Sequence, residues 1–160
     1  MAQVFLGLGS NQGKRKSYLR KALKEIEALG EHMVASHVYR TKPYGFTHQP
    51  DFLNMVVRIE TSLAPEDLLE KLLDIESRLG RIRQQKWGPR TIDIDLLFYD
   101  QHIIKLPHLV VPHPDLHNRD FVLRPMMDID PDFFHPELKK TIRELWNILK
   151  EAHPPQEKES

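Results

Sequence analysis

Two aspartates separated by a single residue are the clearest chemical signal in this sequence. Asp93 and Asp95 belong to an alternating run in which the intervening positions are apolar: Ile92, Ile94 and Leu96. On a strand, residues two apart share one face and lie about 6.5–7 Å apart. Both carboxylates could therefore converge on hard cations, which prefer oxygen ligands. For an isolated pair of this kind, the competing interpretation is the solvated outer face of a surface strand.

The segment before this pair favours the chemical interpretation. Residues 81–90 read RIRQQKWGPR, with four cations, no carboxylate, and Gly and Pro near the end. This composition predicts a mobile, electropositive loop. Such a loop beside two carboxylates suits a magnesium-bound polyphosphate, because metal ions and basic side chains neutralise the phosphates together.

The glycine-rich segment 7–14 resembles two phosphate-binding motifs, but it matches neither. A P-loop would require Gly at Leu8 and Ser or Thr at Arg15. A dinucleotide-binding fingerprint would require its third Gly at Gln12. We therefore interpret the segment as a tight turn between a strand and a helix. Three residues suit left-handed or capping positions there: Gly9, Ser10 and Asn11.

Isolated polar and aromatic residues leave two interpretations open. Phe52 and Asn54 share one face of a strand, where they could stack on and hydrogen-bond a flat heterocycle, although Phe52 would also suit a core. His113 stands between two prolines and suits either a structural role or contact with a phosphate. Glu76 beside the apolar stripe of a helix would usually be a surface residue.

Composition restricts the class of protein. The chain has 160 residues, no cysteine, and 23 basic against 23 acidic residues. Disulfides and thiolate chemistry are excluded, and the balanced charge does not favour general binding to nucleic acid or membranes. No apolar run approaches the roughly 20 residues of a membrane helix, and the N-terminus lacks the features of a signal peptide. We expect one cytoplasmic domain over residues 1–153 and a polar, disordered tail over residues 154–160.

The hydrophobic pattern predicts the elements that must position these residues. Strands are expected at 4–8, 33–40, 52–61 and after Thr91, with a hairpin at 100–101 leading into 103–104. Helices are expected at 16–29 (with Gly30 as the C′ residue that ends it), 65–79, 121–127 and 141–150, with an extended piece at 107–115. This β-α-β-β-α-β order predicts an α+β, ferredoxin-like layered domain, with a central, mainly antiparallel sheet flanked by helices.

Seven short motifs occur in one order along residues 1–150. They are Gly9-Ser-Asn11, Tyr39-Arg-Thr41, Gln49-Pro-Asp-Phe-Leu-Asn54, Gly80-Arg-Ile-Arg83, Arg90-Thr-Ile-Asp-Ile-Asp-Leu-Leu97, Val111-Pro-His113 and Asn118-Arg-Asp-Phe121. Together they closely resemble the 6-hydroxymethyl-7,8-dihydropterin pyrophosphokinase family of folate biosynthesis. The resemblance implies a monomeric enzyme that uses ATP and two Mg²⁺ ions to transfer pyrophosphate to a hydroxymethylpterin, releasing AMP.

The resemblance also implies roles for individual residues. The catalytic residues would be Arg81, Arg90, Asp93 and Asp95, of which Asp93 and Asp95 would hold the metal ions. The ATP-binding residues would be Glu76, Arg81, Arg83, Trp87, Arg90, Leu96, His113 and Arg119. The pterin-binding residues would be Thr41, Lys42, Tyr44, Phe52, Asn54, Asp93 and Phe121.

A non-catalytic nucleotide- or RNA-binding module on a ferredoxin-like sheet is the alternative function. Such a module would be expected to carry an RNP1-like run of basic, Gly and aromatic residues, which the sequence lacks. Its neutral net charge also counts against this alternative.

Overall fold

A five-stranded antiparallel sheet forms the centre of the protein. The computed structural model describes residues 1–11, 13–42, 51–80 and 91–152. In the sheet, β2 (Glu31–Ala35), β4 (Phe52–Thr61), β1 (Ala2–Ser10) and β5 (Asp93–Tyr99) lie in that order, and the short β3 (Tyr39–Thr41) also pairs with β4. This is the split βαβ arrangement, so the predicted α+β, ferredoxin-like fold is confirmed.

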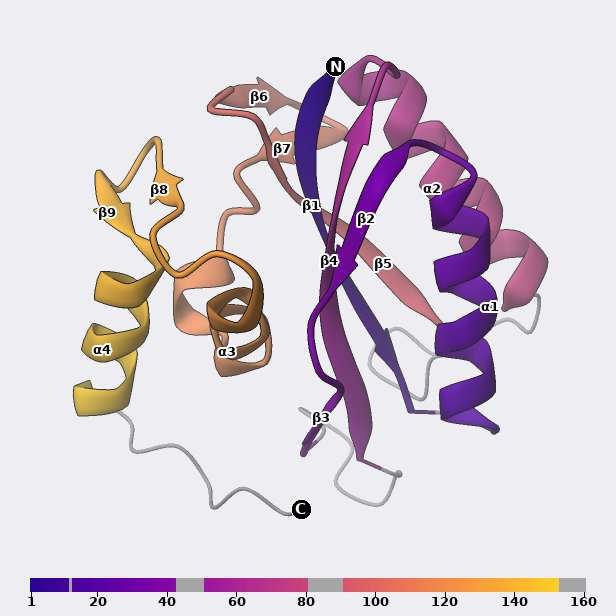
Figure 1. The fold of residues 1–160 in the computed structure, drawn as a ribbon, viewed down its shortest axis with the longest axis horizontal. Helices are drawn as coiled ribbons and strands as arrows, with labels where there is room; N and C mark the ends of the chain where they lie inside the picture. Colours follow the sequence, from indigo (N-terminus) through magenta and orange to yellow (C-terminus); the bar gives the residue numbers. More distant parts are fainter. Residues whose placement is uncertain (12, 43–50, 81–90, 153–160) are drawn as a thin grey trace.

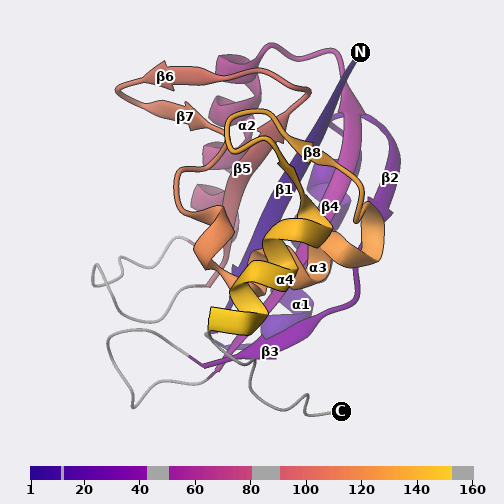
Figure 2. The same ribbon diagram turned by 90° about the vertical axis from the view of Figure 1, so that its left-hand side faces the viewer.

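Helices cover both faces of the sheet (Figure 1). One face carries α1 (Arg15–Glu27) and α2 (Pro65–Leu79), which lie side by side. Figure 2 shows the other side of the molecule, where α3 (Asp120–Ile129) and α4 (Ile142–Ala152) are found. The remaining elements are two small hairpins and a single 3₁₀ turn: β6 (Ile104–Leu106) with β7 (Leu109–Val111), β8 (Phe134–His135) with β9 (Lys140–Thr141), and η1 (Leu116–Asn118).

Each face of the sheet has its own hydrophobic core. Between the sheet and the α1/α2 layer, strand residues such as Ile59 pack with Ile26 and Leu72. On the opposite face, Phe5 and Phe98 pack with residues of α3 and α4. Because side chains alternate along a strand, one strand can supply residues to both cores. The central strands are thereby held from two sides, which gives the polar residues at their ends a rigid support.

Several predicted elements agree with the structure, and others do not. The strand at 52–61 and the helix at 65–79 have the predicted bounds, and helices occur near 121–127 and 141–150 as predicted. The single strand at 33–40 is wrong, because the chain forms β2 and β3 with a break at Ser36. The backbone N–H of Ser36 donates to the Val56 carbonyl at 2.9 Å, and its hydroxyl accepts from the Val56 N–H at 2.9 Å. The side chain thus replaces a backbone partner at the break.

The predicted hairpin at 100–101 is also wrong. The chain does turn at Asp100, where φ is 49°. However, β6 pairs with β7 rather than with β5. Asp100 instead bonds to the start of β1, where its carboxylate accepts from the backbone N–H of Gln3 and its own N–H donates to the Gln3 carbonyl, each at 2.8 Å.

Two glycine interpretations need correction. Helix α1 is capped at Ala28, so Gly30 is not its terminating residue. A Cβ at Gly30 would lie 2.2 Å from the Glu60 carbonyl oxygen, so glycine permits close approach to β4 there. Gly9 and Ser10 lie within β1, and the N-cap of α1 is Lys14. The turn interpretation is therefore wrong for Gly9 and Ser10, and none of Gly9, Ser10 and Asn11 is the N-cap.

In the portion of the chain that the structure describes, none of the helices is both long enough and apolar enough to cross a membrane. Residues 153–160, which include the predicted tail, lie outside the described residues.

Candidate active site

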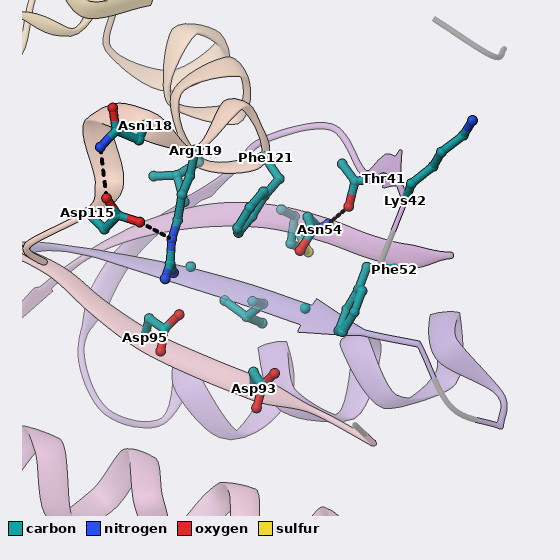
Figure 3. Close-up of a pocket in the computed structure, with 15 residues that line it drawn as sticks. Thr41, Lys42, Phe52, Asn54, Asp93, Asp95, Asp115, Asn118, Arg119 and Phe121 are labelled. Atoms are coloured by element: carbon teal, nitrogen blue, oxygen red, sulfur yellow. Dashed lines mark hydrogen bonds and ion pairs between the residues drawn. The ribbon is translucent and has the colours of Figure 1, made fainter. Parts of the chain in front are cut away.

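A cavity of about 520 Å³ opens between the sheet and the first turn of α3. Figure 3 shows residues from both sheet and helical segments around it. Its lining brings together side chains from distant parts of the sequence, among them Thr41, Lys42, Phe52, Asn54, Asp93, Asp95, Asp115, Asn118, Arg119 and Phe121. Eight of the residues predicted from the sequence therefore lie around one cavity: Thr41, Lys42, Phe52, Asn54, Asp93, Asp95, Arg119 and Phe121.

Two glycines of β1 form the floor of this cavity. Gly9 pairs with Asn54 on one side and Asp93 on the other, and Gly7 pairs with Asp95 in the same way. Neither glycine carries a side chain, so space remains above the sheet between the carboxylates and Asn54. The fit is closest at Gly9, where a Cβ would lie 2.8 Å from Asn54 Oδ1. The sequence alone does not reveal this role, because it depends on pairing between strands.

Asp93 and Asp95 are half-buried and face the cavity. The alternating residues Ile94 and Leu96 are buried in the core beneath α1 and α2. The strand therefore separates the two sets as the alternation predicted. It also places the Leu96 side chain on the opposite face of the sheet from the carboxylates. Leu96 was predicted to bind ATP, and it is not among the residues that line the cavity.

Glu76 reaches the carboxylate strand from α2. Its Oε2 accepts a 2.7 Å hydrogen bond from the backbone N–H of Ile94, the residue between Asp93 and Asp95. In the described sheet β5 is an outer strand, paired only with β1. The Glu76 carboxylate therefore supplies an acceptor on the edge away from β1, and a charged acceptor makes such a bond stronger than a neutral one. This contact holds the backbone that carries the two aspartates.

One end of the cavity suits a flat, polar heterocycle. Figure 3 shows Phe52 on β4 and Phe121 on α3 both projecting into it. Asn54, which is buried, donates a hydrogen bond from Nδ2 to the Thr41 hydroxyl. The guanidinium of Arg119 lies 5.5 Å from the centre of the Phe121 ring, within range of a cation–π interaction. Aromatic faces and a fixed amide are thus combined in one place.

Arg119, the cation beside Phe121, is also held by local contacts. Asn118 donates to Asp115 Oδ1 at 2.8 Å, and Arg119 Nε lies 3.6 Å from Asp115 Oδ2. The Asn118 hydrogen bond, with a smaller contribution from Arg119, lowers the pKa of the Asp115 carboxyl. Figure 3 shows the Arg119 side chain extending into the cavity above the strand that carries Asp95. Asp115 and Asn118 were not predicted as site residues. The sequence did carry a local signal for them, because Asp115 lies three residues before Asn118 and four before Arg119.

His113 lies beside the cavity. Its backbone N–H donates to the Leu97 carbonyl of β5 at 3.0 Å. Burial lowers the pKa of the His113 ring, against the opposing influence of the Asp95 charge. His113 and Glu76 are thus both attached to the backbone of β5, although neither is among the residues that line the cavity.

The donor set of the cavity fits Mg²⁺ better than zinc. No group of three or more His, Asp or Glu side chains suited to a metal ion occurs among the described residues. Mg²⁺ commonly uses one or two carboxylates and completes its coordination with water and substrate phosphates. The pair Asp93 and Asp95 meets that requirement. The predicted residues Tyr44, Arg81, Arg83, Trp87 and Arg90 lie outside the described part of the chain.

Comparison with known proteins agrees with this geometry. The family model described as 7,8-dihydro-6-hydroxymethylpterin-pyrophosphokinase matches residues 5–131. The chain belongs to this family. A protein of Aquifex aeolicus named 2-amino-4-hydroxy-6-hydroxymethyldihydropteridine pyrophosphokinase is 46% identical over 144 residues, which cover 90% of each chain. A protein of Haemophilus influenzae with the same name is 43% identical over 138 residues, covering 85% of this chain and 86% of its own.

Solved structures agree on the fold. The structure of HPPK-DHPS from Plasmodium falciparum, with the substitution A437G, superposes with a TM-score of 0.74 at 17% identity. It covers 96% of this chain, whereas this chain spans 47% of that longer protein. The family and the fold expected from the sequence are both confirmed, and with them the class of reaction: the protein is a pyrophosphokinase.

Proposed function

We propose that this cavity is where the protein transfers pyrophosphate from ATP to the hydroxymethyl group of 6-hydroxymethyl-7,8-dihydropterin, a step of folate biosynthesis. The observation that carries the proposal is the placement of an aromatic, amide-lined slot next to a carboxylate pair in one cavity. The slot suits a pterin, and the carboxylate pair suits a magnesium-bound triphosphate. Family membership makes the same pairing of substrates the expected one.

The pterin occupies the slot between Phe52 and Phe121. Both rings project into the cavity, so they can stack on the two faces of a flat bicyclic ligand. Asn54 offers a carboxamide already oriented by Thr41, and Asp93 lies across Gly9 from it. These groups can read the amide and amino edge of the pterin. Lys42 and Tyr44 are assigned to the same end on the family resemblance.

Asp93 and Asp95 would hold the two Mg²⁺ ions. Bound there, the ions would supply positive charge that neutralises the triphosphate and stabilises the leaving group. The protein itself holds the two carboxylates at a fixed spacing. The hydrogen bond from Ile94 N–H to Glu76 holds the backbone between them.

The reaction forms one phosphorus–oxygen bond and breaks another. The pterin hydroxyl oxygen attacks the β-phosphorus of ATP, and the bond from that phosphorus to the α,β-bridging oxygen breaks, so that AMP leaves with the bridging oxygen. The hydroxyl proton passes to solvent. Alignment of the two substrates lowers the barrier by removing the entropy cost of their encounter. Arg119 is placed to stabilise negative charge at the phosphate end.

The remaining assignments rest on the family resemblance. Arg81 and Arg90 are proposed as catalytic residues that bind the phosphates, and Arg83 and Trp87 as further contacts to ATP. Glu76 and His113 contact the backbone of β5, and we assign them to the ATP side. Leu96 is assigned there on the family resemblance alone, because its side chain lies in the core on the other face of the sheet. We also propose that the protein acts in the cytoplasm, where a sequence without cysteine fits the reducing environment, and that it acts as a monomer, as the family resemblance implies.

Neutral substitutions of the two aspartates test the metal assignment. Asp93→Asn and Asp95→Asn should each lower turnover by at least about a hundredfold, the scale associated with losing one key electrostatic contact. The matched control is Asp132→Asn, which removes a charge from an exposed pair with Arg143. The control should retain full activity. Near wild-type turnover by folded Asp95→Asn protein at saturating Mg²⁺ would refute the assignment.

A further inference from the structure

The carboxylate of Asp128 joins α3 to β3. Its Oδ2 accepts a 2.8 Å hydrogen bond from the Tyr39 hydroxyl and a 3.1 Å bond from the backbone N–H of His37. The Nδ1 of the His37 ring lies 3.1 Å from the same oxygen. One carboxylate oxygen therefore connects the last turn of the helix to the start of a strand about 90 residues earlier in the chain.

On the helix side, Asp128 lies on the same face of α3 as Phe121, a residue that lines the cavity. Phe121, Arg124 and Asp128 are spaced by three and then four residues, so they share one face of α3. The Arg124 guanidinium lies 4.9 Å from the centre of the Tyr39 ring. Two of the three side chains therefore hold Tyr39, while the third, Phe121, lines the cavity.

On the strand side, a residue of the contact likewise shares a face with a residue of the cavity. Tyr39 and Thr41 are two residues apart on β3, so they share the face that looks toward α3. Tyr39 pairs with Asn54, and Thr41 pairs with Phe52 across the strands. Thr41 in turn accepts the hydrogen bond from Asn54. The position of β3 relative to α3 thus sets the distance between Thr41 and Phe121 on opposite walls of the cavity.

The bond is well placed to hold that distance. Asp128 as a residue is exposed, but only 24% of its side-chain surface is, so water competes in part with its partners. Burial and the hydrogen bond to Asp128 raise the pKa of Tyr39 to about 12, so the hydroxyl keeps the proton that it donates. Strand β3 has only three residues and pairs with β4 alone in the described sheet, which makes an additional attachment important for its position.

We propose that Asp128, acting through Tyr39, is a positioning residue for the pterin slot. It fixes β3 against α3, so that Thr41 and Asn54 meet the edge of the pterin while Phe121 covers its face. This inference rests on the proposed assignment of the slot to the pterin. Asp128 does not line the cavity, so its effect on ligands passes through β3.

Two variants test the role of the contact. Tyr39→Phe removes only the hydroxyl and keeps the ring beside Arg124, whereas Asp128→Asn removes the charge of the acceptor. Affinities are measured by calorimetry for a non-hydrolysable ATP analogue with Mg²⁺, and for the pterin at saturating analogue. Each variant should bind the pterin about tenfold more weakly, equivalent to about 1.4 kcal/mol, with less than a twofold change for the ATP analogue. The losses in the two single variants should not add up in the double variant, because both changes act on the hydrogen bond between Tyr39 and Asp128.

The control is Asp132→Asn, which should leave both affinities unchanged. Melting temperatures establish whether each variant is folded. If Asp128→Asn does not fold, Tyr39→Phe alone tests the inference. The inference is overturned if the folded variants bind the pterin like the wild type, or if both ligands weaken equally. If the wild-type protein itself failed to bind the pterin, the proposed function would be refuted instead.

Discussion

Adding one methyl group at Gly9 should selectively damage the pterin slot. The Cβ of an alanine there would lie 2.8 Å from Asn54 Oδ1, a distance that real Cβ contacts essentially never show. Asn54 cannot move aside and also keep its present contacts, because it is only 6% exposed and its Nδ2 donates to Thr41. The clash in Gly9→Ala is therefore relieved by turning Asn54 away from its place at the pterin edge.

The loss of pterin affinity in Gly9→Ala follows from the free energy needed to return Asn54 to the pterin edge. Overpacking a tight site costs about 1–3 kcal/mol. If pterin binding must force Asn54 back against the new methyl group, the affinity falls by roughly 5- to 150-fold at about 1.4 kcal/mol per factor of ten. The affinity for Mg²⁺ and an ATP analogue should change less, because the atoms that the new methyl group would meet belong to Asn54 and Phe52 and not to Asp93.

Calorimetry on Gly9→Ala and on Gly7→Ala provides the comparison. Both glycines lie on the same face of β1 and line the cavity. A Cβ at Gly7 would meet Leu97 Cδ1 at 3.4 Å, within ordinary van der Waals contact. Gly7→Ala should therefore bind the pterin much more tightly than Gly9→Ala. Equal pterin affinity in Gly9→Ala and wild-type protein would refute the reasoning about Asn54.

Three further results are expected. Phe121→Ala should weaken pterin binding in calorimetry more than ATP-analogue binding, since stacking adds about 0.5–1.5 kcal/mol beyond burial; a loss confined to the nucleotide would contradict the slot. Glu76→Ala should lower the free energy of unfolding in urea by about 1–3 kcal/mol, because the buried Ile94 N–H loses its acceptor, and Glu76→Gln should recover part of that loss. Burial lowers the pKa of His135, so the unfolded chain takes up a proton first as the pH falls, and stability present above about pH 6.5 should be lost below it. His135→Asn should reduce this dependence in urea titrations at pH 7 and pH 5, and an unchanged slope would contradict the assignment.

The sequence predicted those features that depend on neighbouring residues. The strand Phe52–Thr61 and the helix Pro65–Leu79 have regular apolar spacing, and Pro65 is favoured in a helix's first turn. The separation of Asp93 and Asp95 from the core residues of β5 follows from the same alternation. Family motifs then supplied residues such as Phe121 that spacing alone would assign to a core.

Features that depend on distant residues were not predictable. The break at Ser36 depends on the backbone of Val56, and the partner of β6 depends on how the chain returns after β5. The need for glycine at position 9 arises from the close approach of Asn54 on a neighbouring strand. No periodicity in the sequence indicates the contact between Asp128 and Tyr39, because it joins a helix to a strand across 89 positions.

Product analysis tests the central claim most directly. Phosphorus NMR of the wild-type protein with ATP, Mg²⁺ and 6-hydroxymethyl-7,8-dihydropterin should show one AMP and one pterin diphosphate formed per ATP consumed, with no turnover when the pterin or Mg²⁺ is omitted. Asp132→Asn should give the same spectrum, and Asp95→Asn should give almost no product. Formation of ADP, or release of AMP without the pterin, would contradict transfer of pyrophosphate to the pterin in this cavity.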